Sequence, residues 1–114
     1  MKIKKYDILF VDQIPETLEN KKIYICIPCN LVIHKCACGC GEQVVTPIDI
    51  DRGWILTYDG ETISLSPSIG NWSFNCQSHY CIHQNHVKWL NNYNHKKYKK
   101  NKILNFFKKK RFVY

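Results

Sequence analysis

Four cysteines and one histidine have the residue types and the spacing of metal ligands. Cys36, Cys38 and Cys40 recur at every second residue, and Cys76 and His79 follow later in the chain as a second short group. In an extended segment the three clustered sulfurs point to the same side. Zinc binds four N or S ligands at tetrahedral corners, and two short groups on separate turns supply them with little backbone strain. The sequence therefore predicts a zinc site.

These five candidates exceed the four positions of a structural zinc site. Either Cys38, Cys40, Cys76 and His79 bind the metal, or Cys36, Cys38 and Cys40 bind it with Cys76 and leave His79 free; the spacing does not distinguish the two sets. A site closed by four protein ligands is structural, because catalysis needs an open position for water. An iron–sulfur centre of the Rieske type is less favoured, because the first group lacks a histidine. The competing interpretation is a set of buried thiols that act as small apolar residues.

Three further cysteines stand outside this pattern. Cys26 and Cys29 form a Cys-x-x-Cys pair that could be a redox dithiol or a second metal half-site; no βαβ pattern surrounds it, which favours a structural role. Cys81 is most simply a core or edge thiol. The cysteine count of seven is odd and no secretory sequence precedes it, so we expect reduced thiols in a cytoplasmic protein. No apolar run approaches the roughly twenty residues of a transmembrane helix, so we expect no membrane span.

A serine near a histidine offers a second kind of chemistry. Ser68 lies in the stretch 66–72, which is rich in turn formers and which we expect to form an ordered loop that projects its hydroxyl. His34 or His79 could remove the hydroxyl proton, as nucleophilic catalysis requires. Turn N–H groups near Gly70 could stabilise an oxyanion. The competing interpretation is a turn serine whose hydroxyl caps backbone groups.

Short β-rich runs must position these residues. Strands are expected at 8–11, 22–27 and 31–34, with a helical turn at 15–19. Two hairpins follow, 54–58 with 61–65 around Asp59-Gly60, which favours a type I′ turn, and 79–83 with 87–90 around Gln84-Asn85. We predict a mainly β fold: a small, zinc-stabilised β domain of hairpins over residues 1–92, followed by a Lys-rich C-terminal extension, residues 93–114, that forms a basic helix or arm.

The positive charge is concentrated in that extension. Nine of the seventeen Lys and Arg residues fall between positions 96 and 111, whereas residues 1–95 hold eight of them against all nine acidic residues. The body is therefore near −1, and the net charge of +8 belongs to the tail. Aromatic residues interleave with the lysines, which suits nucleic-acid binding through residues 96–111. A membrane-surface arm and a merely solvated face fit the same composition.

The motif-bearing part of the chain resembles a known family. The run His34–Pro47, Trp54, the run Asp59–Phe74 and the run Cys76–Tyr80 are similar to small bacterial proteins of domain of unknown function family 6527, over about residues 6–90. Members of that family are encoded beside ubiquitin-like proteins and their activating and conjugating enzymes. The resemblance implies a role in a bacterial ubiquitin-like conjugation system active in phage defence, with those proteins as partners.

The resemblance also implies a serine-type peptidase that acts on the ubiquitin-like protein, with Ser68 as nucleophile and His34 or His79 as base. We therefore predict an enzyme of the deubiquitinase kind that processes or removes a ubiquitin-like modifier and holds a structural zinc ion. The alternative is a non-catalytic zinc-binding module that recruits the modifier or its conjugating enzyme. A third possibility is nucleic-acid binding through the basic tail.

Overall fold

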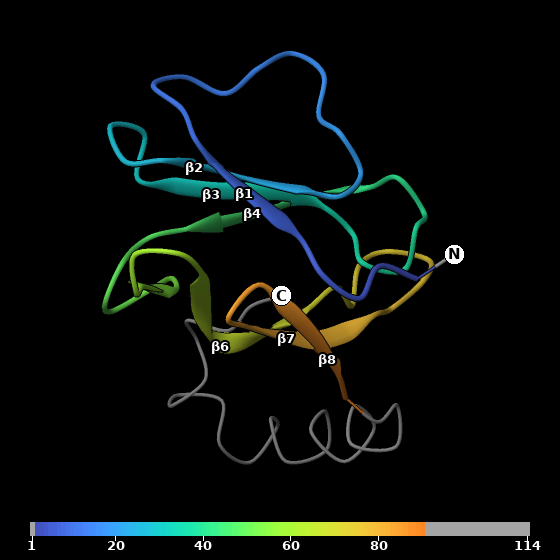
Figure 1. Ribbon diagram of the computed structural model, residues 1–114. Coiled ribbons are helices and arrows are strands. Elements are labelled where there is room, and N and C mark those ends of the chain that lie inside the picture. The colour runs from blue at the N-terminus through green and yellow to red at the C-terminus, as the bar shows by residue number, and fades with distance from the viewer. Residues whose placement is uncertain (1, 91–114) are drawn as a thin grey trace.

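The computed structural model describes residues 2–90, which form eight strands in two four-stranded sheets (Figure 1). The first sheet has the order β1-β2-β3-β4 and the second the order β5-β6-β7-β8. Within residues 2–90 there is no helix, so the predicted mainly β fold is confirmed. The strands are β1 (Asp7–Phe10), β2 (Lys22–Cys26), β3 (Leu31–Lys35), β4 (Gln43–Pro47), β5 (Ile55–Tyr58), β6 (Ile63–Gly70), β7 (His79–His83) and β8 (His86–Trp89).

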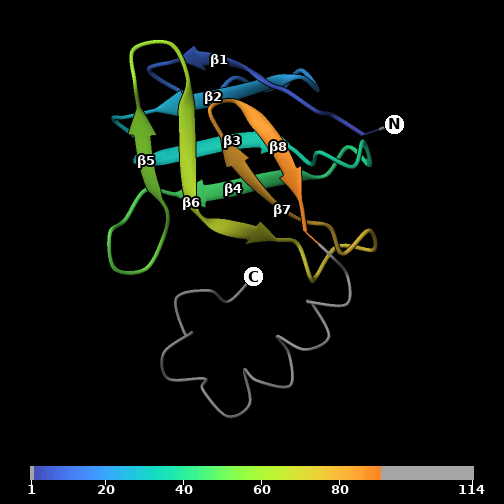
Figure 2. The same ribbon diagram turned by 60° about the horizontal axis from the view of Figure 1, so that its bottom comes forward.

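The main core lies between the two sheets, whose strands cross one another (Figure 2). Side chains alternate along each strand between this inward face and the outer face. From the first sheet, Ile23 and Ile25 are fully buried, and from the second sheet Ile69, Tyr80 and Ile82 are buried almost completely. Each buried aliphatic side chain of this size stabilises the fold by about 1.5–3 kcal/mol. Because Ile69 and Tyr80 point inward, their neighbours along β6 and β7 point to the outer face of the second sheet.

The outer face of the first sheet is covered by the connection from β1 to β2. These two strands are parallel, so the chain must cross over between them, whereas every other strand pair in residues 2–90 is antiparallel. Leu18 of this connection packs against Tyr24 and Ile33 as a second small cluster. The predicted helical turn at 15–19 is wrong, since these residues form no helix; the crossover instead buries Leu18 on the sheet.

Strand β6 differs most from expectation. The loop predicted at 66–72 is wrong for residues 66–70, because β6 continues to Gly70. The pairing with β7 shifts register between Leu65 and Ile69, and this irregularity accommodates Pro67, which has no N–H for a regular ladder. The predicted type I′ turn at Asp59-Gly60 is also wrong: only Gly60 has positive φ, and the Asp59 carboxylate accepts bonds from the N–H groups of Glu61 and Thr62 in a wider loop.

Cys26 and Cys29 form a disulfide at the turn between β2 and β3. The expectation of reduced thiols is therefore wrong for this pair, while the other five cysteines, including half-buried Cys81, are free. Within residues 2–90, no helix has the length and the apolar character needed to cross a membrane. The basic extension 93–114 lies outside the described residues, and so do its predicted helix or arm and its predicted contact with nucleic acid.

Candidate functional site

Four cysteines from two separate turns come together beside the start of β7. The Sγ atoms of Cys36, Cys38, Cys40 and Cys76 all lie within 4.8 Å of one another. The individual separations are 3.5 Å between Cys36 and Cys38, 3.8 Å between Cys36 and Cys76, and 3.9 Å between Cys40 and Cys76. Tetrahedral zinc with bonds of about 2.3 Å separates its sulfur ligands by about 3.8 Å. The four thiols therefore have the donor chemistry and the spacing that bind a metal ion.

Two buried polar side chains support this cluster. Ser78 Oγ lies 3.0 Å from Cys36 Sγ and 3.5 Å from Cys76 Sγ. Asn71 donates its side-chain amide to Ser78 Oγ at 2.9 Å and to Cys36 Sγ at 3.7 Å, and its backbone N–H donates to the Ser78 carbonyl. Such outer contacts orient the ligands of a metal site. Neither residue was singled out as a supporting residue from sequence, because no spacing pattern connects positions 71 and 78 with 36.

Without a metal, the thiols differ in how readily they ionise. Burial raises the pKa of Cys36 and that of Cys38. Burial also opposes ionisation of Cys76, but hydrogen bonds from Ser78 outweigh it and lower the pKa of Cys76 to about 7. Hydrogen bonding to Ser78 therefore prepares Cys76 to become a thiolate ligand at neutral pH.

Ser68 and His79 are hydrogen-bonded on the outer face of the second sheet. Ser68 Oγ lies 2.9 Å from His79 Nε2, within the reach that a nucleophile and its base require. Ser68 belongs to the irregular part of β6, and His79 is the first residue of β7, paired with Gly70. The structure thus brings together Ser68 and His79, and it places the imidazole nitrogen of His79 on a hydroxyl rather than among the four thiols.

Trp72 packs against His79, and Gly70 leaves room for the Trp72 ring. The Trp72 ring contacts the His79 ring edge to face, with centroids 4.7 Å apart. A Cβ atom at position 70 would lie 2.7 Å from indole atoms of Trp72, which is closer than carbon atoms approach without displacement. Glycine is therefore needed at this position for Trp72 to reach its place against the histidine.

Comparison with known proteins identifies the family of the chain. A family model described as "Bacterial ubiquitination-like system serine protease (BubE)" matches residues 10–90, well over half of the 114-residue chain. The chain belongs to the BubE family. Its family is thus one of a bacterial ubiquitination-like system, which confirms the expected link at that level; the narrower label, domain of unknown function family 6527, stays a prediction. No curated protein and no solved structure matches the chain.

The second candidate base of this BubE family member, His34, lies in the interior of the protein. His34 is fully buried, and its Nε2 shares a 2.9 Å hydrogen bond with the Tyr80 hydroxyl. Burial lowers the pKa of His34 to about 3, so its imidazole is neutral at physiological pH. The Tyr80 oxygen also accepts a bond from the Ala37 N–H at 3.3 Å. His34, on β3 of the first sheet, therefore lies in the buried network that holds the turn of Cys36 and Cys38. Ser68 lies on the outer face of the second sheet.

Proposed function

We propose that this BubE family member is a serine-type peptidase that processes or removes a ubiquitin-like modifier, with Ser68 as nucleophile and His79 as general base. The observation that carries the proposal is the 2.9 Å hydrogen bond between Ser68 Oγ and His79 Nε2. The family description names a serine protease, and Ser68–His79 is the serine–histidine pair that this geometry supports. His34 is assigned no role in proton transfer, because its buried imidazole bonds to Tyr80.

In the proposed reaction, His79 Nε2 takes the Ser68 hydroxyl proton while Oγ attacks the carbonyl carbon of the scissile peptide bond. The tetrahedral intermediate collapses when His79 gives that proton to the leaving amine, which breaks the C–N bond and leaves an ester on Ser68. Water then attacks the ester with His79 again as base, and the carboxylate product departs as Ser68 regains its proton. The ring contact with Trp72 keeps the imidazole aligned through both steps.

We further propose that Cys36, Cys38, Cys40 and Cys76 hold a zinc ion with a structural role. Four thiolates complete a tetrahedral zinc site and leave no position for water. When bound, zinc would fix the two turns that carry these ligands. Cys76 is only three residues before His79, and Asn71 bonds to Ser78 between them. The metal site would therefore position the start of β7, and with it the base.

The decisive experiment compares the full-length, metal-analysed protein with Ser68→Ala and with a matched control, Ser66→Ala, whose exposed serine lies on the same strand. The substrate is a ubiquitin-like protein of a bacterial ubiquitination-like system, carrying its C-terminal extension or joined to a target. Loss of a serine nucleophile lowers kcat by roughly 10⁴-fold or more. We expect this loss in Ser68→Ala and wild-type turnover in Ser66→Ala.

A fluorophosphonate probe gives a second readout, since it should label the wild-type protein and Ser66→Ala but not Ser68→Ala. Full cleavage by Ser68→Ala would overturn the proposal. Binding of the modifier with no turnover by any variant would favour the alternative function, a zinc-binding module that recruits the modifier or its conjugating enzyme.

A further inference from the structure

Strand β6 has a free edge beside the candidate nucleophile. Pairing with β5 ends at Ile55 and Ser66, because both backbone groups of the preceding residue, Trp54, bond to the end of β4: its N–H donates to the Pro47 carbonyl at 2.8 Å, and its carbonyl accepts from Asp49. Among residues 2–90, no strand takes over the β5 side of the segment 67–70. The edge therefore begins next to Ser68.

The backbone of Gly70 points towards this open side. The Asn71 N–H donates to the Ser78 carbonyl, so this facing pair is hydrogen-bonded. Bonded and unbonded pairs alternate in an antiparallel ladder, and the next pair, Gly70 with His79, is therefore unbonded. In agreement, the His79 carbonyl accepts from Leu90 on its other side. The N–H and C=O of Gly70 are therefore directed away from β7; because Gly70 is itself buried, a strand that pairs with them must enter the pocket that Gly70 lines.

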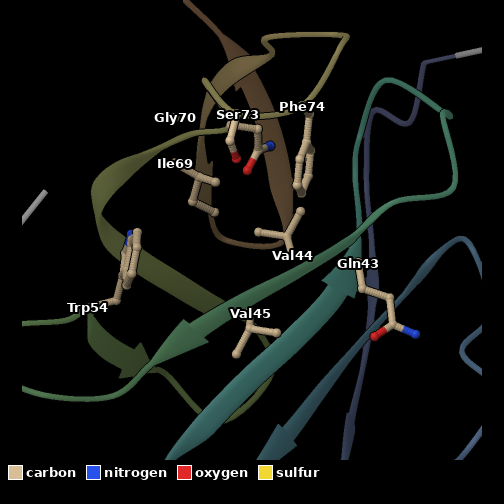
Figure 3. A pocket seen from close by; sticks show the side chains of 9 residues that line it. Gln43, Val44, Val45, Trp54, Ile69, Gly70, Ser73 and Phe74 are labelled. Carbon is tan, nitrogen blue, oxygen red and sulfur yellow. The ribbon is translucent and has the colours of Figure 1, made fainter. Parts of the chain in front are cut away.

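A pocket of about 250 Å³ lies along the same edge, between β6 and the free edge of β4 (Figure 3). Its apolar lining comes from both sheets: Val44 and Val45 of β4, Trp54, Ile69 of β6, and Phe74. The remaining lining residues, Gln43, Gly70, Asn71 and Ser73, carry no charge. Pockets for small molecules usually measure about 300–1,000 Å³. A space below that range, open to two strand edges, suits a short peptide backbone with one apolar side chain.

We propose that the extended C-terminal segment of the ubiquitin-like modifier binds here as an added strand on the free edge of β6, with one uncharged apolar side chain in the pocket. Added strands gain affinity from backbone hydrogen bonds and specificity from alternate side chains. A strand paired with β6 lies about 4.8 Å away, so a serine on the edge strand reaches its backbone. One side chain would enter the pocket, and the adjacent backbone would pass beside Ser68. This inference rests on the proposed function for its occupant.

Binding and cleavage are tested separately with pools of eight-residue fluorogenic peptides in which one position is fixed as Leu, Phe, Ala, Lys or Asp. Binding is followed by amide NMR on the zinc-loaded, full-length Ser68→Ala protein, at up to millimolar peptide. The pocket variant is Ser73→Arg, which places a charge at an exposed side chain of the pocket lining. The control is Leu9→Arg, at an exposed position on β1, the edge of the first sheet that does not line the pocket.

Peptides with Leu or Phe should shift the amides of residues 43–45 and 68–71 and leave those of β1 unchanged. Ser73→Arg should weaken this binding and the cleavage by at least tenfold, whereas Leu9→Arg should match its parent. Absence of binding at millimolar peptide, shifts elsewhere, or equal binding by Ser73→Arg would overturn the inference. Binding at this site without cleavage by the protein that retains Ser68 would refute the peptidase and leave the peptide site. Cleavage that is insensitive to Ser73→Arg would refute the peptide site and leave the peptidase.

Discussion

Replacing Gly70 by alanine tests whether the packing of Trp72 against His79 is needed for the activity. The new Cβ would lie 2.7 Å from Trp72 indole atoms, whereas an ordinary contact is 3.4 Å or more. Either the backbone at position 70 or the Trp72 ring must therefore move by at least 0.7 Å to restore an ordinary contact. The neighbour that must yield is the ring that contacts His79, at a centroid separation of 4.7 Å.

The magnitude follows from two known scales. Overpacking of this kind costs about 1–3 kcal/mol of folding free energy, which a domain stable by about 5–15 kcal/mol survives. A misplacement of about 1 Å at reacting groups costs up to about 10²-fold in rate. Gly70→Ala should therefore remain folded and lose about 10- to 100-fold in kcat against the ubiquitin-like precursor.

The matched control is Gly60→Ala in the loop between β5 and β6. A Cβ there meets no atom within 4 Å, although its φ of +101° strains any other residue. This variant should lose about 1 kcal/mol of stability and keep the wild-type kcat. Thermal unfolding and steady-state kinetics on both variants separate the two effects. A folded Gly70→Ala protein with wild-type kcat would refute the argument that Trp72 positions His79.

Two further predictions concern the base and the metal. His79→Gln should lower kcat by about 10²–10⁴-fold, as loss of a general base does, while His34→Gln should lose stability and retain kcat above one-tenth of the wild type; equal losses, measured by kinetics on folded protein, would contradict the assignment. Zinc removal by a chelator, or Cys76→Ser, should unfold the domain, because structural zinc contributes about 10–16 kcal/mol in zinc-finger peptides. Metal analysis and circular dichroism check this, with Cys81→Ser as the cysteine control that keeps one zinc per chain and the wild-type spectrum.

The sequence predicted the hairpins where local signals were strong. Strands β7 and β8 alternate clearly, and the intervening Gln84 and Asn85 adopt the positive φ values, 48° and 69°, that a tight turn needs. Strand β4 was missed because Val44 and Thr46 are its only buried positions. Its structure depends on pairing with β3, and the run was interpreted as part of the cysteine motif. No local pattern in five residues reports such a long-range partner.

The candidate site was predictable in composition but not in arrangement. The ligand types and Ser68 could be chosen from chemistry and from the family resemblance. The choice between His34 and His79 depends on which face of its own sheet each side chain occupies. The register shift between Leu65 and Ile69 determines the face and the position of Ser68. Pairing register is a property of two strands together, so it could not be derived from either segment alone.

The positions of the free thiols explain why serine, rather than cysteine, is the better assignment for the nucleophile. Four of the five free cysteines gather in the cluster around Cys36, where thiolates would bind a metal ion. Cys81 lies two residues after His79, on the same face of β7. Burial raises the pKa of Cys81 despite the nearby Lys88. Cys81 is therefore kept as the thiol, which is less nucleophilic than a thiolate. Ser68 is the side chain hydrogen-bonded to His79 Nε2. A hydroxyl is a weak nucleophile without an adjacent base, and this hydrogen bond gives Ser68 the base that the proposed mechanism requires.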